Sequence, residues 1–181
     1  MDEAKIRRNR LQLVAIFAVG GLTLIAASVL FYSTRSSGVW GTTNHGEFVQ
    51  PPLTVAELGI EDSDGRPMTE GETWWLWVVA NESCTQACAE AVLQLRQLHV
   101  LLNKDASRVR RALITPKGTP APALLADFPK LEHLRGGAST LKTGIYVVDP
   151  IGNLVFFYPL SDAGKPVLED LKRLLKLSQI G

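Results

Sequence analysis

The sequence has few cysteines and no excess of charge of either sign, and both features narrow the functions that it can serve. Its 181 residues include two cysteines, three histidines and two methionines, and its 19 basic and 18 acidic residues give a formal net charge of +1. Such a balance offers no basic stripe of the kind that binds nucleic acid. No internal repeat, glycine-rich phosphate loop, paired-carboxylate site or Ser/His/Asp arrangement stands out. We therefore expect no nucleic-acid partner, and any thiol chemistry depends on one pair of cysteines.

The N-terminal part of the chain carries a long apolar run. Residues 11–34 include no charge, and as a helix they extend about 36 Å, enough to cross a hydrocarbon core of about 30 Å. Four basic residues precede the run and only Arg35 follows closely, so the positive-inside rule places residues 1–10 in the cytoplasm. A cleavable signal peptide is the alternative, but residues 30–32 (Leu-Phe-Tyr) offer no small-residue cleavage site. We predict one uncleaved transmembrane helix over 11–34 in a cytoplasmic-type inner membrane, with the rest of the chain in the periplasm.

A short polar segment separates this helix from one ordinary domain. Residues 35–52 contain Gly, Thr and Asn and end in a Pro-Pro pair, which is typical of a linker. Residues 53–181, roughly 130 residues, have the size of a single domain. Since an exported domain lies in an oxidising compartment, two cysteines in it form a disulfide by default.

The order of elements in residues 53–181 predicts an α/β fold. We expect strands over 53–60, 74–80, 109–115, 144–149 and 154–158, and helices over 84–103, 123–134 and 166–178. The cysteines lie where a strand gives way to a helix. This arrangement predicts a thioredoxin-like domain preceded by one N-terminal transmembrane helix.

Cys84 and Cys88 follow the apolar strand 74–80 directly. Ser83 and Gln86 have the spacing of a capping box, so we expect Ser83 to be the N-cap and Cys84 the first helical residue. Cys88 then lies one turn further along the same face. A thiol at a helix N-terminus faces the positive end of the macrodipole, which favours the thiolate form. Two thiols so placed can close a disulfide or bind a soft metal ion.

Several segments resemble the Sco/SenC family, membrane-anchored thioredoxin-fold proteins that assist copper insertion into cytochrome c oxidase. The Asp-Gly-Arg-Pro turn at 64–67 resembles the family's turn before its central strand, and Cys84-x-x-x-Cys88 resembles its copper-binding motif. The segment 145–153 (Ile-Tyr-Val-Val-Asp-Pro-Ile-Gly-Asn) resembles the family's strand and turn near the C-terminus. The resemblance covers 54–177. It implies Cu(I) binding, and cytochrome c oxidase subunits or other copper and assembly factors as partners.

The third copper ligand of that family is missing from its expected place. A histidine lies a few residues before the C-terminal strand in the family, whereas Leu141 stands at that position here. The proline that thioredoxins carry before the same strand is missing too, and Gly144 is its nearest counterpart. His133 could supply a replacement ligand, with ordinary surface placement as the alternative. His99 lies three helical turns beyond the cysteines, too far to share an ion, and His45 lies in the linker.

Three functions therefore remain open. In the first, Cys84 and Cys88 assist cytochrome c oxidase assembly by binding Cu(I), which accepts two thiolates, or by keeping a partner's cysteines reduced. The second is an anchored thiol–disulfide oxidoreductase unrelated to copper, with Cys84 as nucleophile and Cys88 as resolving thiol. The third is an interaction module with a structural disulfide, for which Trp74 is a docking candidate because Trp75 and Trp77 share the other face of the strand. We favour a metallochaperone or assembly factor over a turnover enzyme.

Overall fold

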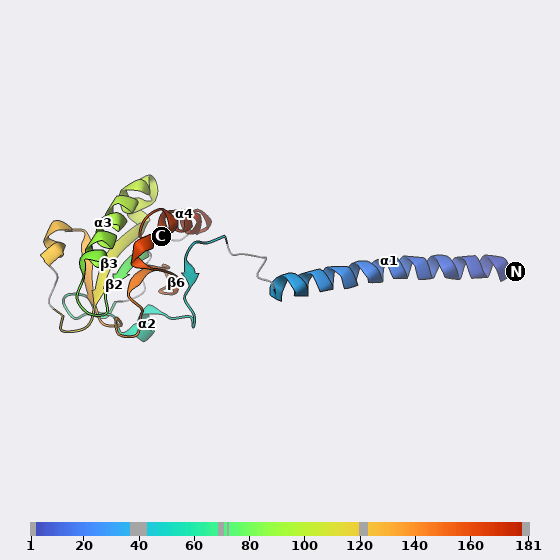
Figure 1. Ribbon diagram of the computed structural model, residues 1–181, viewed down its shortest axis with the longest axis horizontal. Coiled ribbons are helices and arrows are strands. Elements are labelled where there is room, and N and C mark those ends of the chain that lie inside the picture. The colour runs from blue at the N-terminus through green and yellow to red at the C-terminus, as the bar shows by residue number, and fades with distance from the viewer. Residues whose placement is uncertain (1–2, 37–42, 69–70, 72, 120–122, 179–181) are drawn as a thin grey trace. The chain divides into compact units, whose positions relative to one another are not determined.

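The computed structural model describes residues 3–36, 43–68, 71, 73–119 and 123–178 (Figure 1). The chain divides into two compact units, Met1–Thr43 and Asn44–Gly181. The first unit holds helix α1 (Glu3–Ser36). Its stretch Ile6–Ser33 has a mean hydropathy of 2.5 and is long and apolar enough to cross a membrane. The predicted linker falls partly outside the described residues, at 37–42.

The second unit is built on a mixed six-stranded sheet in the order β1-β6-β5-β2-β3-β4. Its strands are β1 (Glu47–Phe48), β2 (Trp74–Val79), β3 (Val109–Thr115), β4 (Leu131–Arg135), β5 (Gly144–Val148) and β6 (Leu154–Tyr158). Strands β2, β3 and β4 run parallel to one another, and the hairpin of β5 and β6 joins β2 in antiparallel register. Strand β2 is therefore central, and all six of its residues are buried.

Helices cover both faces of this sheet. Helices α3 (Gln86–Leu101) and α4 (Lys165–Leu177) pack on one face, and the short helix α2 (Val55–Leu58) packs on the other. Figure 1 shows α3 and α4 on the opposite side of the strands from α2. The shorter 3-10 segments are η1 (Asn103–Arg108), η2 (Ala123–Asp127) and η3 (Leu160–Asp162).

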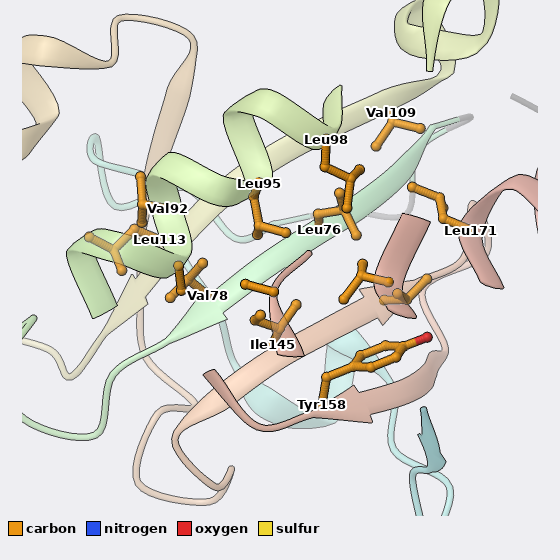
Figure 2. Close-up of a cluster of buried hydrophobic side chains, with 14 of the residues drawn as sticks. Leu76, Val78, Val92, Leu95, Leu98, Val109, Leu113, Ile145, Tyr158 and Leu171 are labelled. Atoms are coloured by element: carbon orange, nitrogen blue, oxygen red, sulfur yellow. The ribbon is translucent and has the colours of Figure 1, made fainter. Parts of the chain in front are cut away.

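Alternate side chains of the strands fill two separate cores, because successive residues of a strand point to opposite faces. The core beneath α3 and α4 contains Leu76, Val78 and Ile145 (Figure 2). The core on the α2 side contains Trp75 and Trp77, whereas Trp74 belongs to the first core. All three tryptophans are at most 7% exposed. The interpretation of Trp74 as a docking surface is therefore wrong.

The predicted fold class is confirmed, and the strands expected over 74–80, 109–115, 144–149 and 154–158 are each right to within one residue. The strand expected over 53–60 is wrong. Residues Val55–Leu58 form a helix because Thr54 and Glu57 make a reciprocal capping box, with the backbone N–H of each donating to the side chain of the other. Gly59, with φ +57°, ends this helix in the left-handed conformation.

The helix expected over 123–134 is also wrong. Residues 123–127 form a 3-10 segment, and Leu131–Arg135 then form strand β4, which pairs in parallel with β3. Pro129 lies between the two elements and removes a backbone N–H that a continuous helix would need. The apolar positions 131 and 134 therefore enter opposite cores of the sheet.

Buried Asp170 on α4 ties the start of the second unit to the sheet. Its carboxylate accepts hydrogen bonds from the backbone N–H groups of His45 at 2.7 Å and Gly46 at 2.9 Å, and from the Tyr158 hydroxyl at 2.9 Å. Burial, together with the Asp170 carboxylate, raises the pKa of Tyr158 far above its ordinary value. His45 is thus docked on α4, where its ring Nε2 lies 2.9 Å from the carboxylate of Glu169.

Candidate functional site

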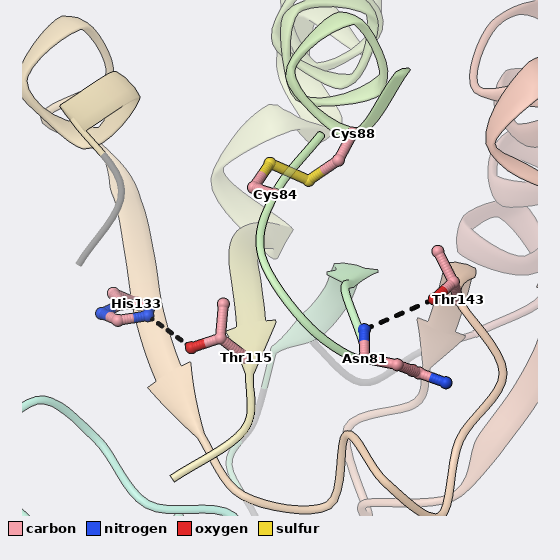
Figure 3. The surroundings of a disulfide bond; sticks show 6 residues. All are labelled: Asn81, Cys84, Cys88, Thr115, His133 and Thr143. Atoms are coloured by element: carbon pink, nitrogen blue, oxygen red, sulfur yellow. Dashed lines mark hydrogen bonds between the residues drawn. A yellow bond between two sulfur atoms is a disulfide. The ribbon is translucent and has the colours of Figure 1, made fainter. Parts of the chain in front are cut away.

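Cys84 and Cys88 form a disulfide where the chain passes from β2 into α3 (Figure 3). Cys88 lies in the first turn of α3 and is 1% exposed, because it belongs to the core beneath that helix. Cys84 lies in the preceding loop and is only half-buried. A reagent or partner therefore reaches the pair through Cys84, while Cys88 is shielded.

The helix begins two residues later than the sequence predicts. Helix α3 starts at Gln86 with Thr85 as its N-cap, and Ser83 is an exposed loop residue. The expectations that Ser83 caps the helix and that Cys84 is its first residue are wrong. Helical residues four apart hold their Cβ atoms about 5–6 Å apart, whereas a disulfide requires about 3.5–4.5 Å. Cys84 must therefore leave helical geometry to bond with Cys88.

Within the described residues, no side chain is found to cap the N-terminal turn of α3. The first backbone N–H groups of a helix have no acceptor within it, and the Thr85 side chain makes no capping hydrogen bond. These donors, together with the helix dipole, stabilise negative charge near the end of the helix. The thiolate form of a reduced Cys84 beside this turn is therefore more favourable than the thiolate form of an ordinary exposed cysteine.

A second loop meets the cysteine loop at the segment before β5. The backbone N–H of Asn81 donates to the Thr143 hydroxyl at 3.4 Å, as Figure 3 shows. The sequence comparison with the Sco family and with thioredoxins draws attention to a histidine and a proline before β5, but not to Thr143. The available signal was its position directly before the strand that pairs with β2.

Packing explains why Gly144 stands where a thioredoxin has proline. Gly144 is buried and pairs with Val79 of β2. A Cβ atom added at Gly144 would lie 2.5 Å from the backbone oxygen of Tyr158 and would also meet the Phe157 ring. The close approach of β6 therefore leaves no room for any side chain at this position, a proline ring included.

The histidines and Leu141 lie away from the sulfur atoms. Leu141 is buried in the core on the α2 side, the opposite face of the sheet from Cys88. His133 lies within β4, where its Nε2 is 2.9 Å from the Thr115 hydroxyl. His99 places its Nε2 2.9 Å from the carbonyl oxygen of Val109.

His133 is neither at a helix end nor on the surface. It is 9% exposed, and its pKa is lowered by burial and, secondarily, by the nearby Arg135 cation. The ordinary surface placement considered for it is therefore wrong, because Leu131–Arg135 form a strand whose residues are buried or half-buried. Among the described residues, no group of three or more His, Cys, Asp and Glu side chains could hold a metal ion. The structure thus brings Cys84 and Cys88 together and leaves His133 with Thr115.

Two kinds of chemistry suit this arrangement. The pair can alternate between disulfide and dithiol, with one accessible and one shielded sulfur. In the reduced form it presents two soft sulfur ligands, which suit Cu(I) because that ion accepts low coordination numbers. The donor set fits Cu(II) poorly, because no imidazole stands beside the sulfurs in the described part of the chain.

Comparisons with known proteins support the same fold. Residues 74–178 match the family model described as "Transmembrane-like, thioredoxin-like, C-terminal domain". No curated protein sequence matches this chain. A solved structure of ScoI from Bradyrhizobium japonicum with copper bound is 21% identical, with 64% of this chain and 96% of that chain covered and a TM-score of 0.49. Other Sco proteins are also among the structural neighbours, as the sequence motifs predicted.

Two further solved structures widen the range of similar proteins. A candidate electron transfer protein from Aquifex aeolicus VF5 is 10% identical, with 70% of this chain and 95% of that chain covered and a TM-score of 0.51. The thioredoxin domain of a thiol-disulfide oxidoreductase from Bacteroides vulgatus is 12% identical, with coverage of 74% and 99% and a TM-score of 0.48. At 10% identity, the likeness to the Aquifex aeolicus protein concerns the fold and not a shared activity.

Proposed function

The chain belongs to the family of transmembrane-like, thioredoxin-like C-terminal domains, and from this starting point we propose that it is a membrane-anchored, Sco-like accessory protein that acts by thiol–disulfide exchange. Its task in this proposal is to keep cysteines of a partner reduced during assembly of cytochrome c oxidase. One observation carries the proposal: a single disulfide joins a half-buried Cys84 to a Cys88 that is 1% exposed, at the start of a helix.

Helix α1 is the membrane anchor in this proposal. Its stretch Ile6–Ser33 has the length and hydropathy for a single crossing. The excess of basic residues before it orients the N-terminus towards the cytoplasm. The domain that begins near Asn44 then lies in the periplasm, where a disulfide persists.

The exchange begins with the reduced pair. The Cys84 thiolate attacks one sulfur of a disulfide on the partner, forms a mixed disulfide with it and releases the partner's other sulfur as a thiolate, which takes up a proton. Cys88, once deprotonated, attacks the Cys84 sulfur, restores the Cys84–Cys88 disulfide and releases the partner's second thiol. Two electrons pass to the partner, and a dithiol protein of the same compartment must supply two electrons to reduce the pair again.

The surroundings support these separate roles for the two sulfurs. The unsatisfied N–H groups at the start of α3 favour the Cys84 thiolate. Burial of Cys88 delays its reaction with outside reagents, so that the mixed disulfide at Cys84 is its natural target. The Asn81–Thr143 hydrogen bond holds the cysteine loop against the segment before β5.

Transport of Cu(I) as cargo is the second candidate. The observation in its favour is that the two cysteines lie next to each other, with their Cα atoms 5.3 Å apart. Two thiolates are sufficient donors for Cu(I). The burial of Leu141 on the other face of the sheet counts against the three-ligand site of the Sco family.

A trapping experiment tests the exchange function. In cells, full-length Cys88→Ser should accumulate mixed disulfides with a partner, because the resolving thiol is missing, whereas Cys84→Ser should trap none. If neither variant traps a partner and the double variant assembles normal cytochrome oxidase, the exchange proposal fails and a structural disulfide remains.

A Cu(I) competition titration on the reduced full-length chain tests the second candidate. One-to-one binding that is lost in Cys84→Ser/Cys88→Ser would favour copper transport. Equal competition by wild type and the double variant would exclude it.

A further inference from the structure

Arg111 is a buried cation for which the described part of the chain supplies no ion-pair partner. It lies in the N-terminal half of β3 and is 6% exposed. Its side chain shares the α3 face of the sheet with Val109 and Leu113, because alternate residues of a strand point the same way. Its Nη1 atom has no hydrogen-bond partner among the described residues. None of the ion pairs found in that part of the chain includes it.

The charges around Arg111 add to the excess of positive charge at this buried position. Burial lowers the pKa of Arg111, and the neighbouring Arg96 cation on α3 lowers it further. Arg96 itself stacks over the Phe128 ring, with 5.6 Å from its Cζ to the ring centroid. An arginine stays protonated even so. Buried charges in proteins are almost always paired. The charged group that acts on Arg111 most clearly is another guanidinium, that of Arg96, and this points to an anion supplied from outside.

Arg111 lines a cavity that opens to solvent. The cavity has a volume of about 520 Å³, and its walls come from the end of α3, η1, β3 and the segment before β4. Three of its nine lining residues, Arg110, Arg111 and Lys130, are cationic, and Glu132 alone is acidic. Glu132 is already held by Arg110, at 2.5 Å. The Ser107 hydroxyl offers a further donor on the wall.

We propose that this cavity is an anion-binding site that takes a carboxylate or phosphate group, with Arg111 as its counter-ion. The planar guanidinium suits such groups because it donates two parallel hydrogen bonds to two oxygens. Lys130 lines the cavity and is exposed to solvent, so its charge attracts the anion without closing the entrance. The group comes either from a free small anion or from an acidic side chain of a partner protein.

The site is separate from the cysteine pair. Strands β2, β3 and β4 are parallel. Cys84 follows the C-terminal end of β2, whereas the cavity lies at the N-terminal ends of β3 and β4, between Val109 and Lys130. A partner or ligand held there leaves Cys84 accessible.

Binding is tested on the full-length chain in nanodiscs of phosphatidylcholine, which add no net lipid charge. Isothermal titration and thermal melting are carried out with sodium phosphate, against sodium chloride at equal ionic strength. We expect saturable phosphate binding and a melting temperature that rises with phosphate. Arg111→Met should abolish the rise and weaken binding at least ten-fold. Arg66→Gln is the matched control and should behave as wild type. Arg66 is exposed on a turn, and its ion pair in the described part of the chain is with Asp64.

The remaining arms separate the outcomes. If Arg111→Met does not fold, Lys130→Gln is tested in its place. A several-fold lower affinity of Lys130→Gln for phosphate supports the site, and an unchanged affinity overturns the proposal. An acetylated tetraglutamate peptide that displaces phosphate identifies a partner's carboxylates as the source, and phosphate binding without displacement identifies a free anion. No saturable response to phosphate or to the peptide, or an equal response in Arg111→Met, overturns the proposal.

Discussion

Serine at position 88 should cost more stability than serine at position 84, although each substitution breaks the same disulfide. The cross-link closes a loop of only five residues, from Cys84 to Cys88. In the chain-entropy description, a loop of that length stabilises the folded state by about 2 kcal/mol. Both variants lose this contribution, so it sets a common baseline.

The difference arises from burial. Cys88 is 1% exposed in the core beneath α3, and a buried hydroxyl without a partner costs about 1–3 kcal/mol. Cys84 is half-buried in a loop, where water satisfies a serine hydroxyl. We therefore expect Cys84→Ser to lower the free energy of unfolding by about 2 kcal/mol and Cys88→Ser by about 3–5 kcal/mol.

Urea unfolding of the detergent-solubilised full-length chain measures both values, followed by the fluorescence of Trp74 and Trp77 in the two cores. Wild type with a reductant isolates the effect of the cross-link. Cys88→Ala isolates the effect of the hydroxyl and should recover most of the difference. Equal unfolding midpoints for the two serine variants would refute the burial argument.

Three further predictions concern neighbouring residues. Reduction frees Cys84 to adopt helical geometry, which would make Ser83 the N-cap of α3. Ser83→Ala should therefore destabilise the reduced chain by about 1 kcal/mol and leave the oxidised chain unchanged. Equal effects in both states would contradict this. Gly144→Ala should cost about 1–3 kcal/mol in urea unfolding because its Cβ would meet Tyr158, whereas Gly71→Ala, in open space, should cost little. The pKa of His133 is lowered by burial, so the unfolded chain binds the proton more readily. The contribution of His133 to the free energy of unfolding should therefore be fully present above about pH 6.5. Below that pH it should fall, by at most about 1.4 kcal/mol per pH unit. His133→Gln should flatten that slope, and an unchanged pH profile would show that another group is responsible.

Local sequence patterns were sufficient to predict those helices and strands whose residues point to a single type of secondary structure. The uncharged run at 11–34 has the length and composition of a spanning helix, and the structure has a helix there. The apolar stretch at 74–79 is buried on both faces, as expected for a central strand of a sheet that is covered on both sides. The hairpin at 144–158 was recognisable because two apolar strands flank the turn at Asp149 and Gly152.

Elements with two competing local signals were mispredicted. Residues 53–60 alternate enough to suggest a strand, but the reciprocal hydrogen bonds of Thr54 and Glu57 select a helix. Strand β4 resembles the end of a helix in sequence, and it is a strand because β3 offers a free edge for parallel pairing. Pairing between residues that are distant in the chain cannot be inferred from a short window.

By itself, the sequence determined the fold class, an N-terminal helix long and apolar enough to span a membrane, and the one pair of cysteines on which any thiol chemistry depends, since each follows from composition or spacing. Tertiary structure alone decided that Cys88 is buried and Cys84 half-buried, that β6 excludes a side chain at position 144, and that Arg111 lies buried beside a cavity with its Nη1 atom unpaired among the described residues. Burial and close approach depend on which distant segments pack together, and that packing is a property of the whole domain and not of any local pattern.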